Sequence, residues 1–222
     1  YMRARDLAKH LIALEHEGFD EAYQGGLEDF ERWLDTEFED DEPEDAAGIF
    51  FAGYAWASYI NASKSDMVAV ADLPFAVALV ERSVEIDPTF FNGSGTVLLA
   101  VVATSAPGAQ IEDAEPAWER AMAITEGKNL LVKVNMARTL AVKKQDREMY
   151  IRLLTEVLEA GDINPEARLQ NMIAKRRAAR YLTQVDQRIP PVVTAPAPAP
   201  TEEAEPEADE AEADAEDAAA EG

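Results

Sequence analysis

The strongest constraint on the fold is a short pattern that recurs along the chain. Val80–Asp87 (VERSVEID) aligns with Trp118–Thr125 (WERAMAIT) 38 residues later, and more loosely with Leu154–Gly161 a further 36 residues on. Ala8–Glu15 matches the same segment from 72 residues upstream, twice the interval of 36. One helix hairpin cannot bury its apolar face alone, so this period predicts hairpins that stack to share a core.

The hydrophobic pattern between these segments is helical as well. Apolar residues recur at spacings of three and four, and no segment alternates with a period of two. We therefore expect an all-α, tetratricopeptide-like stack of antiparallel helix hairpins, with a period of about 34 residues lengthened by loops and a long C-terminal capping helix. The expected helices span residues 1–17, 22–38, 45–62, 66–87, 90–105, 112–126, 129–143, 146–160 and 165–188.

Composition divides the chain into a helical-repeat domain at 1–189 and a Pro/Ala-rich acidic tail at 190–222. The tail has no aromatic residue and too little apolar surface to offset the entropy of ordering, so we expect it to be disordered. Eleven acidic residues and no Lys or Arg lie in the tail, which leaves −13 of the net charge of −24 on the domain. A domain this negative repels phosphate backbones, so nucleic-acid binding is not expected.

Two further observations exclude classes of protein. The longest apolar run, Ala46–Ile60, contains two glycines and is shorter than the 18 or so residues that a membrane span needs, so it predicts a buried helix. The chain has no cysteine, which excludes disulfides, thiolate metal sites and a cysteine nucleophile.

Nothing in the sequence has the pattern of a catalytic or metal site. His10 and His16 are six residues apart on one expected helix, so they do not share a face. Gly93–Thr96 (GSGT) lacks the lysine of a phosphate loop and indicates close helix packing. The acidic run Glu37–Asp45 lacks the turn glycine of a calcium loop and reads as a solvated loop. We expect a protein without catalytic activity, metal or cofactor.

Two segments suggest a binding site, each with a structural alternative. In the helix at 45–62, large aromatic rings lie beside Gly and Ala, which means either close packing or a channel walled by rings that suits an apolar ligand. In the last helix, Arg176 and Arg180 continue the face of Leu169, Met172 and Ile173, with Lys175 and Arg177 nearby. These cations either pair with acids of the preceding repeat or bind a carboxylate of a ligand or partner.

The chain resembles the TatT family, tetratricopeptide-repeat lipoproteins associated with tripartite ATP-independent periplasmic (TRAP) transporters. The resemblance covers about residues 1–189 and rests on the order and spacing of several segments rather than on one motif. These are Tyr1–Leu7 (YMRARDL), Tyr54–Ile60 (YAWASYI), Val70–Pro74 (VADLP), Val77–Pro88 (VALVERSVEIDP), Glu126–Leu130 (EGKNL), Gln145–Glu148 (QDRE) and Arg168–Arg180 (RLQNMIAKRRAAR).

The resemblance implies a periplasmic, lipid-anchored homotrimer that docks the solute-binding protein of a TRAP transporter. It also implies a pore in each protomer that holds or passes an apolar or organic-acid ligand. The pore and ligand candidates carried over are Tyr54, Trp56, Tyr59, Asn129, Lys133, Asn171 and Arg176. The lipidated cysteine and the first helices of the family domain are missing from this chain, and the acidic tail is not a usual family feature.

Two other functions remain open from the residues alone. A general tetratricopeptide hub would bind peptide segments in its groove, with the arginine face reading acidic C-termini. A helical-barrel hydrolase would need two facing carboxylates in a cavity. An enclosed aromatic tunnel would favour transport, and an open groove lined by Arg and Asn would favour peptide binding.

Overall fold

The computed structural model of the chain describes residues 1–39 and 42–191. These residues form helices, turns and loops without a β-strand, which confirms the predicted all-α fold. Of the predicted acidic tail, residues 192–222 lie outside the described part of the chain, and so do residues 40–41 of the acidic run between the third and fourth helices.

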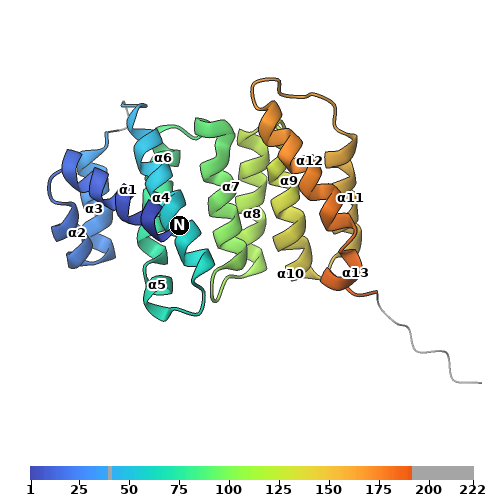
Figure 1. The fold of residues 1–222 in the computed structure, drawn as a ribbon, viewed down its shortest axis with the longest axis horizontal. Coiled ribbons are helices and arrows are strands. Elements are labelled where there is room, and N and C mark those ends of the chain that lie inside the picture. Colours follow the sequence, from blue (N-terminus) through green and yellow to red (C-terminus); the bar gives the residue numbers. More distant parts are fainter. Residues whose placement is uncertain (40–41, 192–222) are drawn as a thin grey trace, which may run out of the picture. The chain divides into compact units, whose positions relative to one another are not determined.

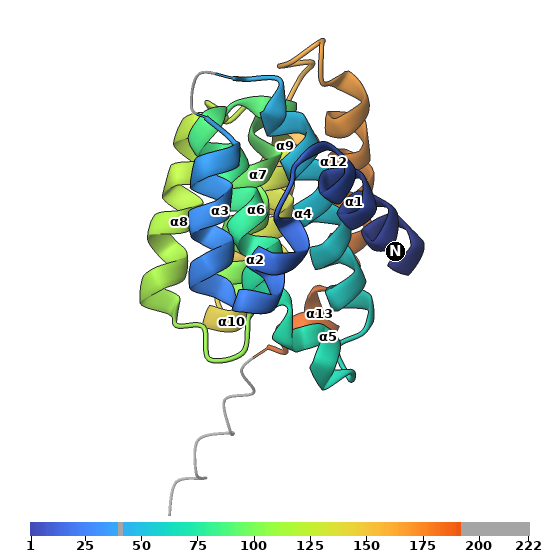
Figure 2. The same cartoon turned by 90° about the vertical axis from the view of Figure 1, so that its left-hand side faces the viewer.

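Successive helices of the domain pair as hairpins that stack on one another (Figure 1). The elements are α1 (Met2–Glu15), α2 (Phe19–Gly25), α3 (Leu27–Glu37), α4 (Asp45–Ala62), α5 (Met67–Ala71), α6 (Leu73–Ile86), α7 (Phe90–Ser105), α8 (Ile111–Ile124), α9 (Leu130–Met136), the π-helical turn η1 (Ala137–Ala141), α10 (Val142–Lys144), α11 (Arg147–Glu159), α12 (Arg168–Leu182) and α13 (Val185–Arg188). Seen from the N-terminal end of the stack, α3 and α8 lie on one side, and α1, α4 and α12 on the other (Figure 2).

Small residues let the hairpins approach closely. A Cβ atom added at Gly53 of α4 would lie 2.6 Å from Val80 Cγ2 of α6, and one at Gly95 of α7 would lie 2.5 Å from Val84 Cγ2. Both distances are far below van der Waals contact, so only glycine fits at these crossings. The interpretation of Gly93–Thr96 as a helix-packing segment is therefore confirmed.

The core runs through the whole stack and contains two fully buried tryptophans, Trp56 of α4 and Trp118 of α8. Trp118 donates its indole N–H to Thr104 Oγ1 at 2.8 Å, which ties α8 to α7. Further along, Tyr150 of α11 donates to the backbone carbonyl of Tyr181 of α12 at 3.0 Å. Each buried polar group in these pairs thus has a partner, whereas the indole N–H of Trp56 has none among the described residues.

Two of the predicted helices are each divided into two shorter ones. The segment at 22–38 divides into α2 and α3 at Gly26, whose φ of 101° and ψ of −177° suit only glycine. The segment at 66–87 divides into α5 and α6 because Pro74 lacks an N–H and its ring clashes with the carbonyl four residues before it.

The predicted capping helix at 165–188 is also shorter than expected. Asn164 Oδ1 accepts a hydrogen bond from the Ala167 N–H at 3.3 Å and holds a turn, so that α12 begins only at Arg168. The helix ends at Leu182, and the separate short helix α13 follows. With 15 residues, α12 is shorter than α4 or α7 and does not extend past the stack as one long helix.

Candidate functional site

The three aromatic candidates of α4 lie on different faces of that helix. Trp56 is fully buried, Tyr59 is half-buried, and Tyr54 has an exposed fraction of 49%. Tyr54 and Trp56 are two residues apart, which places their side chains about 200° apart around an α-helix. The structure therefore does not bring Tyr54, Trp56 and Tyr59 together into one aromatic wall.

Trp56 and Tyr59 face the N-terminal helices, where α1 covers them with cations. The Lys9 ammonium lies 4.2 Å from the ring centroid of Trp56 and 3.9 Å from that of Tyr23 of α2, and the Arg5 guanidinium lies 4.1 Å from that of Tyr59. These distances are those of cation–π contacts. Burial lowers the pKa of Lys9. The α1 side of α4 is thus filled by the chain's own side chains.

Tyr54 belongs to a second aromatic cluster, which is open to solvent. Its ring stacks on Phe50 at a centroid distance of 5.8 Å, and Phe51 lies 5.6 Å from Phe91 of α7. Phe51, Tyr54 and Phe91 are each exposed by about half. The cluster forms an apolar wall that joins α4 to the start of α7, and we call Phe51, Tyr54 and Phe91 the aromatic wall.

A strained turn at the start of α7 sets the position of Phe91. Phe91, Asn92 and Gly93 have φ values of 49°, 56° and 68°, all in the left-handed region. For residues with a side chain this conformation costs roughly 1–2 kcal/mol each. Glycine is needed at position 93, because an added Cβ would lie 2.8 Å from Thr125 Cγ2. Strain of this kind persists only where neighbouring groups hold the backbone in place.

Amide side chains from two other elements hold this turn. Asn129 Nδ2 donates to the Asn92 carbonyl at 2.8 Å, and Asn92 Nδ2 donates to Gln170 Oε1 of α12 at 3.0 Å. Asn164 Nδ2 donates to Asn92 Oδ1 at 3.3 Å. The turn thereby connects α7 to the start of α9 and to α12, and it fixes the distance between the aromatic wall and α12.

Asn129 and Asn171, both predicted as ligand residues, are neighbours but make bonds to the backbone. Asn129 Oδ1 accepts the Leu131 N–H at 3.0 Å and caps α9. Asn171 Oδ1 accepts the Leu130 N–H, and its Nδ2 donates to the Lys128 carbonyl, both at 3.0 Å. Asn129 also lines a pocket of about 150 Å³ beside Asn92. Their donors and acceptors are engaged in positioning α9 and the strained turn.

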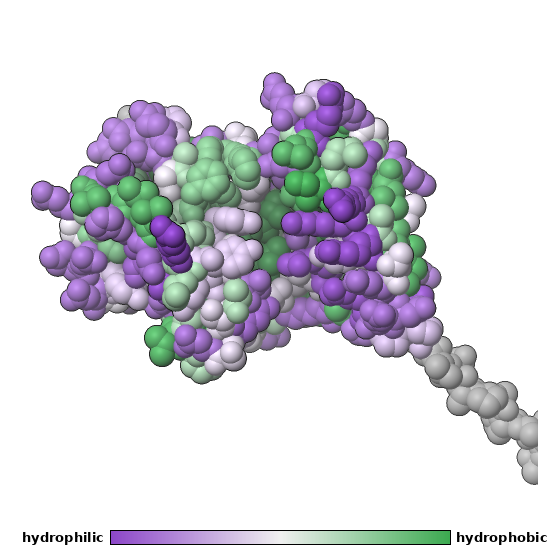
Figure 3. Space-filling model, viewed as in Figure 1, coloured by the Kyte–Doolittle hydropathy of each residue, from purple (hydrophilic) through white to green (hydrophobic). Residues whose placement is uncertain are grey.

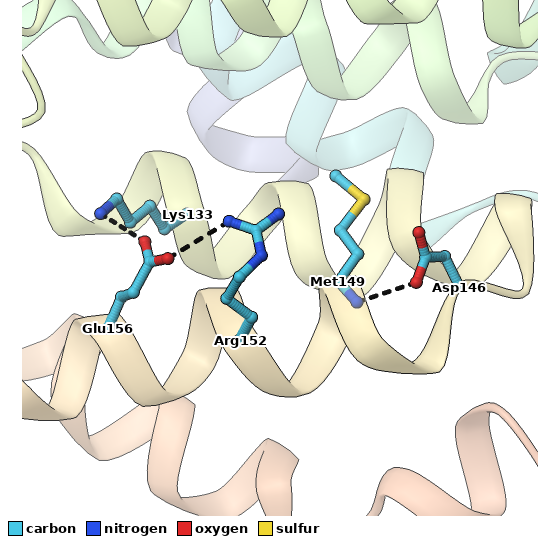
Figure 4. Close-up of polar contacts among 5 residues, drawn as sticks. All are labelled: Lys133, Asp146, Met149, Arg152 and Glu156. Carbon is cyan, nitrogen blue, oxygen red and sulfur yellow. Dashed lines mark hydrogen bonds and ion pairs between the residues drawn. The ribbon is translucent and has the colours of Figure 1, made fainter.

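Lys133 lies on the side of α9 that faces α11. Its ammonium contacts Glu156 Oε2 at 2.7 Å, and Arg152 of α11 contacts the other carboxylate oxygen at 3.2 Å (Figure 4). The hydrogen bond from Lys133 lowers the pKa of Glu156 despite the opposing effect of burial. Lys133 is thus neutralised by a neighbouring helix, and the structure does not group it with Tyr54 or Arg176.

Arg176 lies on the exposed face of α12, as the sequence predicts. Leu169, Met172 and Ile173 of the same helix are also exposed, whereas Asn171, Ala174 and Ala178 are buried against α9 and α11. Within the described residues no carboxylate lies within ion-pair distance of Arg176, Arg177 or Arg180. Of the two interpretations of these arginines, pairing with acids of the preceding repeat therefore does not hold for any of the three.

The molecular surface is hollowed between α4 and α12, with an apolar floor (Figure 3). The region of α12, with many hydrophilic side chains, borders the hollow on one side. The region of α4 and the start of α7 borders it on the other. We call this hollow the interhelical cleft. The structure thus exposes Tyr54 on α4 and Arg176 on α12, the two helices between which the cleft lies. It places Trp56, Tyr59 and Lys133 in contacts with other elements.

Sequence reasoning missed Phe91 and the strained turn as parts of the site. The dipeptide Asn92-Gly93 is a strong turn signal, and it falls inside the helix predicted at 90–105. It also missed Arg138 of η1, which lies near Tyr181 of α12 and helps to lower the pKa of its hydroxyl. No sequence signal links positions 138 and 181, because they meet only through the packing of α9 and η1 against α12.

A stack of helix hairpins with an open cleft on one face defines a tetratricopeptide-like helical-repeat protein. A protein-family model described as TRAP transporter T-component matches residues 1–188, and the chain belongs to that family. No curated protein matches the chain. Membership gives the protein a role in a TRAP transport system, which is a non-enzymatic role and agrees with the resemblance seen in the sequence. Among the described residues, no helix is long and apolar enough to cross a membrane.

Proposed function

We propose that the protein is a periplasmic adaptor that docks the solute-binding protein of its TRAP system and holds an apolar or organic-acid ligand in the interhelical cleft. The observation that carries the proposal is the cleft itself, which has an apolar floor (Figure 3). It lies between the region of α4 and the start of α7, which bears the exposed rings of the aromatic wall, and α12, which bears exposed arginines without carboxylate partners among the described residues. Apolar surface with a few polar groups at one end is the usual composition of a site for an amphipathic small molecule.

Two features of the cleft support the ligand-binding part of the proposal. The aromatic wall offers rings that contribute to affinity when a ligand covers them, because about 25 cal/mol is gained per Å² of apolar surface buried. The amide network around Asn92 fixes the wall relative to α12 before any ligand binds. Binding to a preformed cleft costs less conformational entropy than binding to a flexible one.

Ligand binding is tested by calorimetric titration of the full chain with octanoate, a simple amphipathic acid. We expect Tyr54→Ala to weaken binding by about tenfold, because the ring contributes roughly 1.5 kcal/mol when covered. Val68→Ala in α5 is the matched control, since Val68 is also exposed and apolar. The helix α5 lies at the end of α4 that is far from the start of α7 (Figure 1). Equal affinity of the wild type and Tyr54→Ala would contradict a ligand site at the aromatic wall.

Docking is tested by purification of the tagged full chain from a native extract, followed by identification of the proteins that co-purify. The proposal predicts a solute-binding protein of a TRAP system among them, in stoichiometric amount. Recovery of cytoplasmic proteins without any solute-binding protein would contradict it.

The proposal includes a homotrimer held at the membrane by a lipid anchor, as the family resemblance implies. Light scattering during gel filtration measures the first part, and a mass near three times 24.3 kDa is the expected result. A monomer at micromolar concentration would contradict the trimer. The mass of the protein isolated from its own cells, with or without an added lipid, tests the anchor.

A second function is favoured by one observation, namely that the cleft is open on the face shown in Figure 3 rather than closed over. An open cleft bordered by arginines also suits an extended acidic peptide. Competition separates the two functions. If a peptide with an acidic C-terminus binds to the full chain more tightly than octanoate and displaces it, the protein is a peptide-binding hub.

A further inference from the structure

Three arginines from three elements surround the side chain of Tyr181 at the C-terminal end of α12. The Arg180 guanidinium lies 5.1 Å and the Arg188 guanidinium of α13 lies 5.4 Å from the centroid of the Tyr181 ring. Arg180 Nη2 also donates to the Tyr181 hydroxyl oxygen at 3.5 Å, and Arg138 of η1 lies near enough to that hydroxyl to lower its pKa. We call Arg138, Arg180, Arg188 and Tyr181 the basic cluster.

Among the described residues, no acidic side chain forms an ion pair with these three arginines. Of the arginines in the described part of the chain, Arg147, Arg152 and Arg168 each pair with a carboxylate, whereas the three of the basic cluster pair with none. The chain has 44 acidic and 20 basic residues. Neighbouring guanidinium groups repel one another, so a bound anion would stabilise the cluster.

The Tyr181 hydroxyl supplies a further donor. Guanidinium groups donate and never accept, so the hydroxyl oxygen accepts from Arg180. Among the described residues this hydroxyl has no acceptor for its own hydrogen. Burial raises the pKa of Tyr181, but the two arginines lower it by more in total. Hydrogen-bond donors and positive charge therefore converge on one point, and the guanidinium side chains are exposed to solvent.

The basic cluster and the cleft share the same edge of α12. Gln170 touches Asn92 of α7 and so marks the edge that faces the cleft. Ile173, Arg177 and Arg180 follow at spacings that keep one side of an α-helix. Ile173 and Arg180 are seven residues apart, which is about 10 Å along the helix. A ligand with a short apolar chain can therefore lie along the cleft and reach the cluster.

The position of Arg138 agrees with this arrangement. By spacing, Leu131, Asn135 and Arg138 share one face of α9 and η1, and each is at least partly exposed. Arg138 lies in a π-helical turn, where the widened backbone redirects side chains. Such turns are frequent at functional sites.

From this geometry we infer that Arg138, Arg180 and the Tyr181 hydroxyl form a subsite that binds the carboxylate of an organic acid whose apolar part lies in the interhelical cleft. The inference rests on the proposed ligand-binding function and names the chemical class of the ligand. Guanidinium groups favour carboxylates because their planar fork donates two parallel hydrogen bonds. Arg188 contributes positive charge from the far side of the ring.

The experiment compares two probes that share an apolar chain and differ in the head group, namely octanoate and 1-octanol. Calorimetric titration of the full chain should show octanoate binding at least tenfold more tightly than 1-octanol. Arg138→Gln and Arg180→Gln should each weaken octanoate binding by about tenfold or more, because a charge-assisted hydrogen bond contributes roughly 1.5–3 kcal/mol. Binding of 1-octanol should not change in these variants.

Arg120→Gln is the matched control, since Arg120 of α8 is exposed and has no carboxylate partner in the described part of the chain. Tyr181→Phe keeps the ring and removes the hydroxyl, and it should weaken octanoate binding but not 1-octanol binding. Urea unfolding of each variant shows that the fold is kept, which is expected because both substituted arginines are exposed.

The outcomes separate this inference from the proposed function. If both probes bind equally and the arginine variants bind as the wild type does, the cleft is a ligand site but the carboxylate subsite is wrong. If neither probe binds, the proposed ligand-binding function itself fails. A loss of octanoate affinity in Arg120→Gln equal to that in Arg180→Gln would show an effect of net charge and would also overturn the subsite.

Discussion

Asn171 of α12 accepts a hydrogen bond from the backbone N–H of Leu130 at 3.0 Å, across 41 residues of sequence. The same amide donates to the Lys128 carbonyl, also at 3.0 Å, so one side chain satisfies both sides of the turn that precedes α9. Asn171 is 6% exposed. A family-based prediction placed it in a ligand pore, whereas its contacts are those of a residue that fastens α12 to α9.

We therefore expect Asn171→Leu to lower the free energy of unfolding by about 1–3 kcal/mol, because it leaves a buried N–H and a partly buried carbonyl without partners. Urea unfolding followed by circular dichroism measures the change. Glu166→Gln is the control, as Glu166 is exposed in the turn before α12. A change below about 0.5 kcal/mol for Asn171→Leu, the range of ordinary surface substitutions, would refute the structural role.

The all-α fold and the helix at Asp45–Ala62 were predictable from the sequence because hydrophobic periodicity over many residues depends on local geometry. The candidate site was predictable only in part. Tyr54 and Trp56 look alike in sequence, but α1 covers the face of Trp56 and leaves that of Tyr54 open. Which face of a buried helix remains open depends on how the neighbouring helices pack, and no local pattern contains that information.

The close contact between Gly95 and Val84 gives a prediction about packing. Gly95→Ala should lower the free energy of unfolding by roughly 1–3 kcal/mol, because the new methyl group would lie 2.5 Å from Val84 Cγ2 and force α6 and α7 apart. Gly48→Ala is the matched control in α4. A Cβ there meets no atom within 4 Å, so this substitution should raise stability by about 0.5–1 kcal/mol through helix propensity alone. Equal effects of the two substitutions would contradict the packing.

Tyr23 gives a prediction about alkaline pH. Burial first, and then the hydrogen bond to Asp72 Oδ1 at 2.9 Å, raise the pKa of Tyr23 to about 12 from an unfolded value of 10.0. The folded state favours the protonated phenol, so its contribution to stability is complete below pH 10 and is lost between pH 10 and 12.

Tyr23→Phe should thus cost about 0.5–1.5 kcal/mol at pH 8, the usual contribution of one hydrogen bond, and the cost should shrink as the pH approaches 12. Urea unfolding at several pH values measures it. Asp72→Asn is the companion variant, since it removes the negative charge that helps raise the pKa of Tyr23. A cost of Tyr23→Phe that is constant from pH 8 to 12 would show that the phenol is not perturbed.

Glu81 of α6 should destabilise the protein at neutral pH. Burial, followed by the negative charges of Glu31 of α3 and Glu85, raises the pKa of Glu81. The folded state therefore favours the protonated carboxyl, and stability falls as the pH rises through the raised value. Glu81→Gln should raise the free energy of unfolding at pH 7 by roughly 0.5 kcal/mol, the effect of one like-charge pair on a helix.

This gain should vanish when the pH is lowered below about 4, where the glutamate of the wild type is itself neutral. Thermal unfolding at pH 7 and pH 3.5 gives both values. Glu119→Gln serves as the control, because Glu119 is exposed on α8 and has no charged partner among the described residues. A loss of stability at pH 7 in Glu81→Gln would mean that the carboxylate has a stabilising partner instead.

Substitution of Lys133 tests whether the role of this residue is structural or ligand-binding. Its ion pair with Glu156 at 2.7 Å lowers the pKa of that carboxyl, so the pair stabilises the folded state above the unfolded pKa of Glu156 and is lost as the pH falls through the lowered folded value. Lys133→Met should cost up to about 1 kcal/mol at pH 7, as expected for a partly exposed pair, and less at pH 3.

Octanoate affinity should remain unchanged in Lys133→Met, because its ammonium reaches across to Glu156 of α11 (Figure 4). Lys128→Met is the matched control, since Lys128 pairs with Glu126 through side chains that are both more than half exposed, and we expect it to have little effect on stability or binding. Suppose instead that Lys133→Met weakens octanoate binding as much as Arg180→Gln does. Lys133 of α9 would then be a ligand residue that pairs with Glu156 only when no ligand is bound. That result would require Lys133 to exchange Glu156 for the ligand carboxylate, and the pKa of Glu156 would then rise when octanoate binds.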